Sequence, residues 1–127
     1  MKEKIRILVG VDGSNYSDRA LLEAVTIAKE FSGFVKVITV YGRGLEQKAN
    51  AVLEHSKLYL ENEVEYTVAA ILGSNPARAL ENTAKHEDFD LIVVGSRGLG
   101  SKVSILLGSV SRRVVANSDC NVLVVKK

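Results

Sequence analysis

Short runs of apolar, largely β-branched residues recur along the chain, separated by longer stretches in which apolar residues return every three or four positions. Residues 5–11, 91–94 and 122–125 are apolar almost throughout, and residues 35–40 are similar. Such runs are typical of strands covered on both faces, as in parallel sheets flanked by helices. Residues 64–68 instead alternate apolar with polar side chains. That alternation predicts an edge strand with one wetter face.

The intervening stretches have the spacing of helices. Four apolar stripes of this kind predict helices that each place one face on the core. They lie in residues 20–31, 45–60, 77–84 and 103–114. Gly33 follows the first stripe as a stop signal. Asn75 and Pro76 have the residue types of an N-cap and a first helical position. Gly108 is expected to interrupt the last stripe.

Strands and helices alternate, and the chain ends on a strand, which implies right-handed crossovers and a parallel sheet with helices on both sides. We therefore predict an α/β fold: a single domain over residues 1–127, built as a three-layer, doubly wound parallel sheet of five strands. The strand order is 3-2-1-4-5 if the chain reverses direction after the third strand. This order brings the ends of strands 1 and 4 together at the switch point, where ligands bind. Residues 12–14 and 95–98 follow those two ends.

Composition and charge narrow the function classes. The chain has 127 residues, 46% hydrophobic and 25% charged, which fits one globular domain. Its net charge is +2, from 17 basic and 15 acidic residues, and it has no tryptophan. That balance gives little long-range attraction to nucleic acid or to a membrane surface, and few aromatic platforms for stacking bases. We expect neither a nucleic acid nor a membrane partner.

Cys120 is the only cysteine, so an intrachain disulfide or a thiolate-rich metal site is excluded. Its expected role is that of a small buried apolar side chain. The first apolar run is too short for a signal-peptide core or a membrane span. We therefore expect a cytoplasmic protein.

Two glycine-containing segments are candidates for binding phosphate. In residues 95–100, three glycines would let amide groups approach a ligand closely, and Arg97 could reach phosphate oxygens. The alternatives are a plain tight turn and a solvated arginine. Residues 108–111 open the last predicted helix, where unpaired N–H groups and the hydroxyls of Ser109 and Ser111 would attract an anion. The alternative is that one of these serines is only an N-cap. Together the two segments would clamp a polyphosphate chain.

The sequence lacks the motifs of several well-known nucleotide-binding and phosphate-accepting sites. Residues 95–102 differ from a P-loop because the lysine follows the serine, and the glycine pattern of a dinucleotide site is absent. The third strand lacks the aspartate that a response-regulator receiver would phosphorylate. Asp12 directly follows strand 1, where its carboxylate could contact a ligand. Alternatively, Asp12 forms an Asx turn or the N-cap of the following helix. His55 and His86 lie in charge-rich helical stretches, where we expect solvated side chains without a serine or carboxylate partner. No residue is predicted to be catalytic.

The spacing Gly95-x2-Gly98-x9-Gly108-Ser109 resembles the ATP-binding signature of the universal stress protein family. Residues 11–14 and 120–125 add matches, so that the resemblance covers nearly the whole chain. It implies an adenine nucleotide alpha-hydrolase-like fold and binding of ATP, or of ADP or AMP, commonly with Mg or Mn. By this resemblance, Asp12 and Val40 would hold the adenosine, with Val11 beside them. The residues that would bind ribose and phosphates are Gly95, Arg97, Gly98, Gly108, Ser109, Val110 and Ser111.

The chain also departs from the family pattern. Gly10 and Asn121 stand where relatives often have proline, and the connection after Val40 is short. The short connection would leave the adenine more exposed and its binding weaker.

The last strand is predicted to be an edge, yet Val122, Leu123, Val124 and Val125 are all apolar. A symmetric homodimer through this strand would cover it, and the family resemblance implies the same. Alternatively, the two terminal lysines simply protect the edge of a monomer. The leading functional hypothesis is a nucleotide-dependent regulatory, stress-response module. The alternatives are a slow metal-dependent ATPase, at most weakly active because no general base is evident, and a nucleotide-free dimeric interaction domain.

Overall fold

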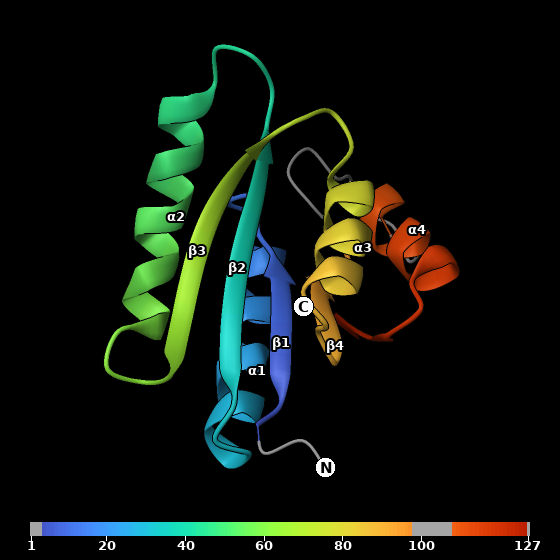
Figure 1. The fold of residues 1–127 in the computed structure, drawn as a ribbon. Coiled ribbons are helices and arrows are strands. Elements are labelled where there is room, and N and C mark those ends of the chain that lie inside the picture. The colour runs from blue at the N-terminus through green and yellow to red at the C-terminus, as the bar shows by residue number, and fades with distance from the viewer. Residues whose placement is uncertain (1–3, 98–107, 127) are drawn as a thin grey trace.

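The computed structural model describes residues 4–97 and 108–126. Five parallel strands form one sheet in the order β3-β2-β1-β4-β5, which confirms the predicted topology (Figure 1). The elements are β1 (Arg6–Gly10), α1 (Asn15–Glu30), β2 (Phe34–Tyr41), α2 (Glu46–Leu60), β3 (Glu65–Leu72), α3 (Pro76–His86), β4 (Leu91–Gly95), α4 (Ser109–Asn117) and β5 (Asn121–Val125). The predicted helical residues 103–107 lie outside the described ranges.

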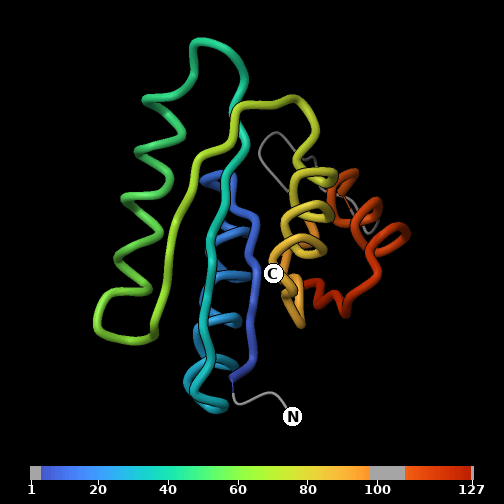
Figure 2. The backbone as a smooth tube through the Cα atoms, in the orientation of Figure 1, coloured from blue at the N-terminus to red at the C-terminus, as the bar shows by residue number. Residues whose placement is uncertain are grey.

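The helices cover both faces of the sheet. α1 and α2 lie on one face and α3 and α4 on the other, as the ribbon and the tube both show (Figures 1 and 2). Successive residues of β1 therefore belong to different cores. Ile7 and Val9 pack in the cluster formed with α1 and α2, whereas Leu8 packs in the cluster with α3. All three are fully buried, as expected for the central strand of a parallel sheet.

Two helices begin where the sequence indicates. The Ser14 hydroxyl accepts a hydrogen bond from the Ser17 amide and caps α1. The side chain of Asn75 accepts from the Arg78 amide, and Pro76 occupies the first turn of α3. Both caps satisfy N–H groups that a helix N-terminus leaves without intrahelical partners. Because α1 follows β1 and α3 follows β3, both caps lie at the carboxyl edge of the sheet.

The two outer strands are the edges of the sheet, as predicted. β3 extends beyond the alternating residues 64–68 and runs through residue 72, because it pairs with β2 up to Tyr41. β5 pairs with β4 along all five residues, from Leu91↔Asn121 to Gly95↔Val125. Residues 122–125 remain partly exposed. Within the described ranges, no helix has the length and apolar character needed to cross a membrane.

Candidate functional site

A cavity of about 220 Å³ lies at the carboxyl ends of β1 and β4. The switch-point rule predicts a ligand site at this place. Its described lining residues are Gly10, Val11, Asp12, Ser17, Ile38, Val40, Pro76, Leu80, Val94, Gly95, Arg97, Gly108, Ser109, Val110 and Ser111. Nine of the ten site residues predicted from the sequence are among them. The tenth, Gly98, lies outside the described residues.

Asp12 forms a turn directly after β1. Its Oδ1 accepts a hydrogen bond of 2.9 Å from the Ser14 amide, so the predicted Asx turn is present, whereas the N-cap of α1 is Ser14. The Asp12 amide donates to the Oγ of Ser17 at 3.3 Å, and that hydroxyl donates to the Ser14 carbonyl at 3.0 Å. Ser17 is buried. These bonds fix the backbone of Asp12 at the cavity wall.

The N-terminus of α4 forms another wall. Gly108 is the cap residue and has no side chain, so the expectation that Ser109 or Ser111 could be only an N-cap is wrong. The Gly108 amide donates to the Ser96 carbonyl at 2.6 Å. The buried Ser111 hydroxyl donates to the Gly108 carbonyl at 3.1 Å. A helix that begins without a side-chain cap offers its first N–H groups to an anion.

Glycines allow close approaches around this cavity. A Cβ on Gly95 would lie 2.7 Å from the Tyr16 carbonyl oxygen, so glycine is required where the start of α1 passes the end of β4. A Cβ on Gly10 would lie 2.9 Å from Cδ1 of Leu80. Leu80 therefore packs directly over Gly10, and both residues line the cavity.

The cavity has an apolar side and a polar side. Ends of β1 and β2 contribute Val11, Ile38 and Val40, while Arg97 and the segment 108–111 contribute the polar groups. The first turns of α1, α3 and α4 all contribute lining residues. Their partial positive charges therefore act on the same space. Such a cavity suits a ligand with a flat apolar part and an anionic part.

Sequence reasoning missed Gly10, Ser17, Ile38, Pro76, Leu80 and Val94 as lining residues. Ser17 had a local signal, because its spacing from Ser14 matches a capping turn at the start of a helix. Pro76 also had one, since it opens the helix that follows β3. Ile38, Leu80 and Val94 look like ordinary core residues in the sequence, and only their tertiary positions bring them to the cavity.

Two other expectations need correction or comment. His55 is not without a carboxylate partner: its Nε2 lies 3.1 Å from Oδ2 of Asp18 across the α1–α2 contact, and its ring meets Tyr59 edge-on. Cys120 is only partly buried. Among the described residues, no three His, Cys, Asp or Glu side chains gather in a way that could hold a metal ion.

The model of the universal stress protein family matches residues 5–126, so the chain belongs to the universal stress protein family. Universal stress protein YxiE of Bacillus subtilis (strain 168) is 32% identical over 145 residues, covering 95% of this chain and 98% of YxiE.

Solved structures agree with this assignment. Hypothetical protein MJ0577 has a TM-score of 0.88 at 25% identity, with 99% of this chain and 98% of that one covered. A universal stress protein in complex with cAMP has a TM-score of 0.80 at 30% identity, with 98% of each chain covered. The fold is the adenine nucleotide alpha-hydrolase-like fold of these structures.

Proposed function

We propose that this universal stress protein binds an adenine nucleotide, ATP or one of its products ADP and AMP, in the cavity at the ends of β1 and β4. The observation that carries the proposal is the joint lining of one cavity by Asp12, Val40 and the N-terminal segment 108–111 of α4. The cAMP complex of a relative that is 30% identical supports a ligand of this class.

In this proposal the apolar side takes the adenosine. Val11 and Val40 would contact the base, and Asp12 would hold the ribose or the base edge. The other proposed ligands, for ribose and phosphates, are Gly95, Arg97, Gly98, Gly108, Ser109, Val110 and Ser111. The amide groups at the start of α4 and the guanidinium of Arg97 suit phosphate oxygens.

Mg or Mn would accompany the nucleotide through its phosphates. Asp12 is the one carboxylate among the described residues that line the cavity, so the protein offers too few ligands for a cage of its own. That donor set suits Mg, which binds through one or two carboxylates plus substrate phosphates. When bound, the ion would neutralise phosphate charge. Asp12 and the hydroxyls of Ser109 and Ser111 are the groups that would hold it or its water shell.

We propose binding, with a regulatory or stress-response role, rather than efficient hydrolysis. The described lining residues include no histidine, lysine or glutamate, and serine without an activating base is a weak nucleophile. Metal-dependent release of phosphate over repeated turnovers would instead identify a slow ATPase. A cytoplasmic location follows from the proposal, because ATP is most available there, and cell fractionation would test it.

We also propose a homodimer through β5. This strand is an edge with partly exposed Val122, Leu123, Val124 and Val125, and a second copy would pair its free backbone groups. Light scattering at micromolar concentration should give the mass of two chains. A monomeric mass would contradict this part of the proposal.

The nucleotide proposal is tested by mass spectrometry of small molecules released from the freshly purified protein, with calorimetric titration of ATP and Mg. We expect bound adenine nucleotide or saturable heat, both reduced in Gly108→Val. If the purified protein contains no bound nucleotide and gives no heat of binding at millimolar ATP, the proposal is overturned. The chain would then be better explained as a dimeric interaction domain.

A further inference from the structure

One wall of the cavity at the ends of β1 and β4 is a leucine that reaches over a glycine. Leu8 and Gly10 are on the same face of β1, because residues alternate between the two faces of a strand, and Leu8 packs in the cluster with α3. At Gly10 this face carries no side chain. A Cβ there would lie 2.9 Å from Cδ1, 3.2 Å from Cδ2 and 3.5 Å from Cγ of Leu80. The branched end of Leu80 therefore occupies the space that a side chain at position 10 would take.

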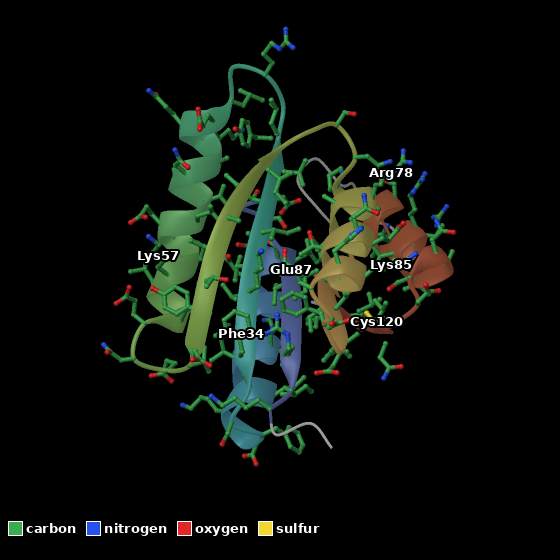
Figure 3. The ribbon with its side chains drawn as sticks, viewed as in Figure 1. Phe34, Lys57, Arg78, Lys85, Glu87 and Cys120 are labelled. Carbon is green, nitrogen blue, oxygen red and sulfur yellow. The ribbon has the colours of Figure 1, made fainter. Side chains whose placement is uncertain are left out.

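Helix α3 directs Leu80 toward the sheet. Pro76 and Leu80 are four residues apart, so they are on the same side of α3, and both line the cavity. Arg78, between them, is exposed and lies on the outer side of the helix (Figure 3). Asn75 accepts a hydrogen bond from the Arg78 amide and caps the helix. The start of α3 thus determines that Leu80 faces the cavity.

Leu80 has little freedom to move aside. Its side chain is only 2% exposed. It packs in the same buried cluster as Ile38 and Val94, and both of these residues line the cavity as well. Protein interiors are close-packed, so a change in the volume of one core side chain is felt by its neighbours. Leu80 is therefore a fixed boundary of the cavity, and the depth of the cavity depends on the size of the residue at position 80.

This boundary is on the side of the cavity that we assign to the base of the nucleotide. Gly10 directly precedes Val11. Ile38 is two residues before Val40 and therefore on the same face of β2. Neither Leu80 nor Ile38 has a polar side-chain atom, so this wall distinguishes ligands by their size. In an apolar pocket, one methylene group more or less changes affinity about 10- to 200-fold.

We propose that Leu80 is a specificity-determining residue of the nucleotide site and selects the size of the base. Its side chain, seated over Gly10, limits the depth of the cavity beneath the base. The site would then take unsubstituted adenine and reject adenine that carries a bulky group. This inference rests on the proposed function and adds to it which part of the ligand the apolar wall selects.

The test compares the affinity for ATP with that for two analogues that carry a bulky group on the base. They are ATP benzylated on the exocyclic amine of adenine, and 2-methylthio-ATP. Competition calorimetry gives the ratio of each analogue's dissociation constant to that of ATP. In Leu80→Ala we expect this ratio to fall about tenfold or more for at least one analogue, because the shortened side chain leaves room for the added group.

Leu80→Val, which is one methylene group shorter than the leucine, should lower the same ratio by a smaller factor. This variant also decides the matter if Leu80→Ala does not fold, and circular dichroism checks the folding of each variant. The matched control is Leu60→Ala, which removes the same atoms from a fully buried leucine at the end of α2, outside the described lining of the cavity. We expect Leu60→Ala to leave both ratios unchanged.

Two results would overturn the inference while the nucleotide proposal stands. One is unchanged ratios in the folded Leu80 variants although the unmodified protein binds ATP. The other is an equal change of the ratios in Leu60→Ala, because the effect would then belong to core packing in general. If the unmodified protein does not bind ATP, the proposed function and this inference fail together.

Discussion

The amide nitrogen of Gly108 lies 2.6 Å from the carbonyl oxygen of Ser96 and donates a hydrogen bond to it. This bond joins the segment that follows β4 to the N-terminus of α4. Ser96 is itself held in the sheet, because its amide donates to the Val125 carbonyl at 3.0 Å. Ser96 is thus hydrogen-bonded both to the start of α4 and to the last strand.

Gly108→Val should reduce nucleotide affinity. A Cβ at this position would lie 3.2 Å from the Ser96 oxygen and 3.4 Å from Cα of Arg97, so the backbone of one segment must move. We expect the affinity for ATP to fall about tenfold, which corresponds to about 1.4 kcal/mol, measured by calorimetry. Gly42→Val is the matched control, since a Cβ there meets nothing within 4 Å. Equal affinities of the two variants would contradict the prediction.

Two substitutions of Asp12 distinguish the contribution of its turn hydrogen bond from that of its negative charge. Asn keeps an oxygen that accepts from the Ser14 amide, whereas Ala leaves this amide without its 2.9 Å bond. We expect Asp12→Ala to lower the free energy of unfolding by about 1 kcal/mol, and Asp12→Asn to lower it less. Urea denaturation measures both. If Asp12→Asn and Asp12→Ala lower the free energy of unfolding equally, the turn hydrogen bond does not account for the contribution of Asp12 to stability.

Gly10→Ala should act through Leu80. The new methyl group would push against Cδ1 of Leu80, 2.9 Å away, and this side chain is almost fully buried. We expect a loss of about 1–3 kcal/mol of stability from overpacking, together with weaker ATP binding because Leu80 moves into the cavity. A smaller residue at position 80 should relieve the clash. In a double-mutant cycle of Gly10→Ala with Leu80→Val, we therefore expect the double variant to lose less stability than the sum of the two single losses. Additive losses of stability would refute the mechanism.

Tyr66 should ionise later than an ordinary tyrosine. Its hydroxyl donates to the Glu61 carboxylate at 2.7 Å, and this hydrogen bond raises the pKa of Tyr66, with smaller contributions from desolvation and the negative charge of Glu61. Because the folded-state pKa is raised, the bond stabilises the fold below pH about 10, and the contribution is lost as the pH rises through the raised value. Ultraviolet titration follows tyrosinate formation, and the step that disappears in Tyr66→Phe belongs to Tyr66. We expect this step to occur at lower pH in Glu61→Gln than in the unmodified protein.

The fold and much of the candidate site could be predicted because both depend on short-range patterns. Apolar runs identified the strands, and their order placed Asp12 and Gly95 at one edge of the sheet. The contacts that escaped prediction depend on how elements lie across one another. Leu80 reaches the cavity because α3 passes over the end of β1, and His55 meets Asp18 through the contact between α1 and α2. No pattern within a single helix contains this information.

The walls of the cavity at the ends of β1 and β4 come from five separated parts of the chain, residues 10–17, 38–40, 76–80, 94–97 and 108–111. No local fragment can assemble them, so a ligand of this cavity recognises the native state and not the unfolded chain. By mass action such a ligand stabilises the whole protein, by about 2.7 kcal/mol at a concentration one hundred times its dissociation constant. Where degradation follows unfolding, the lifetime of this protein would therefore record how much ligand its surroundings contain.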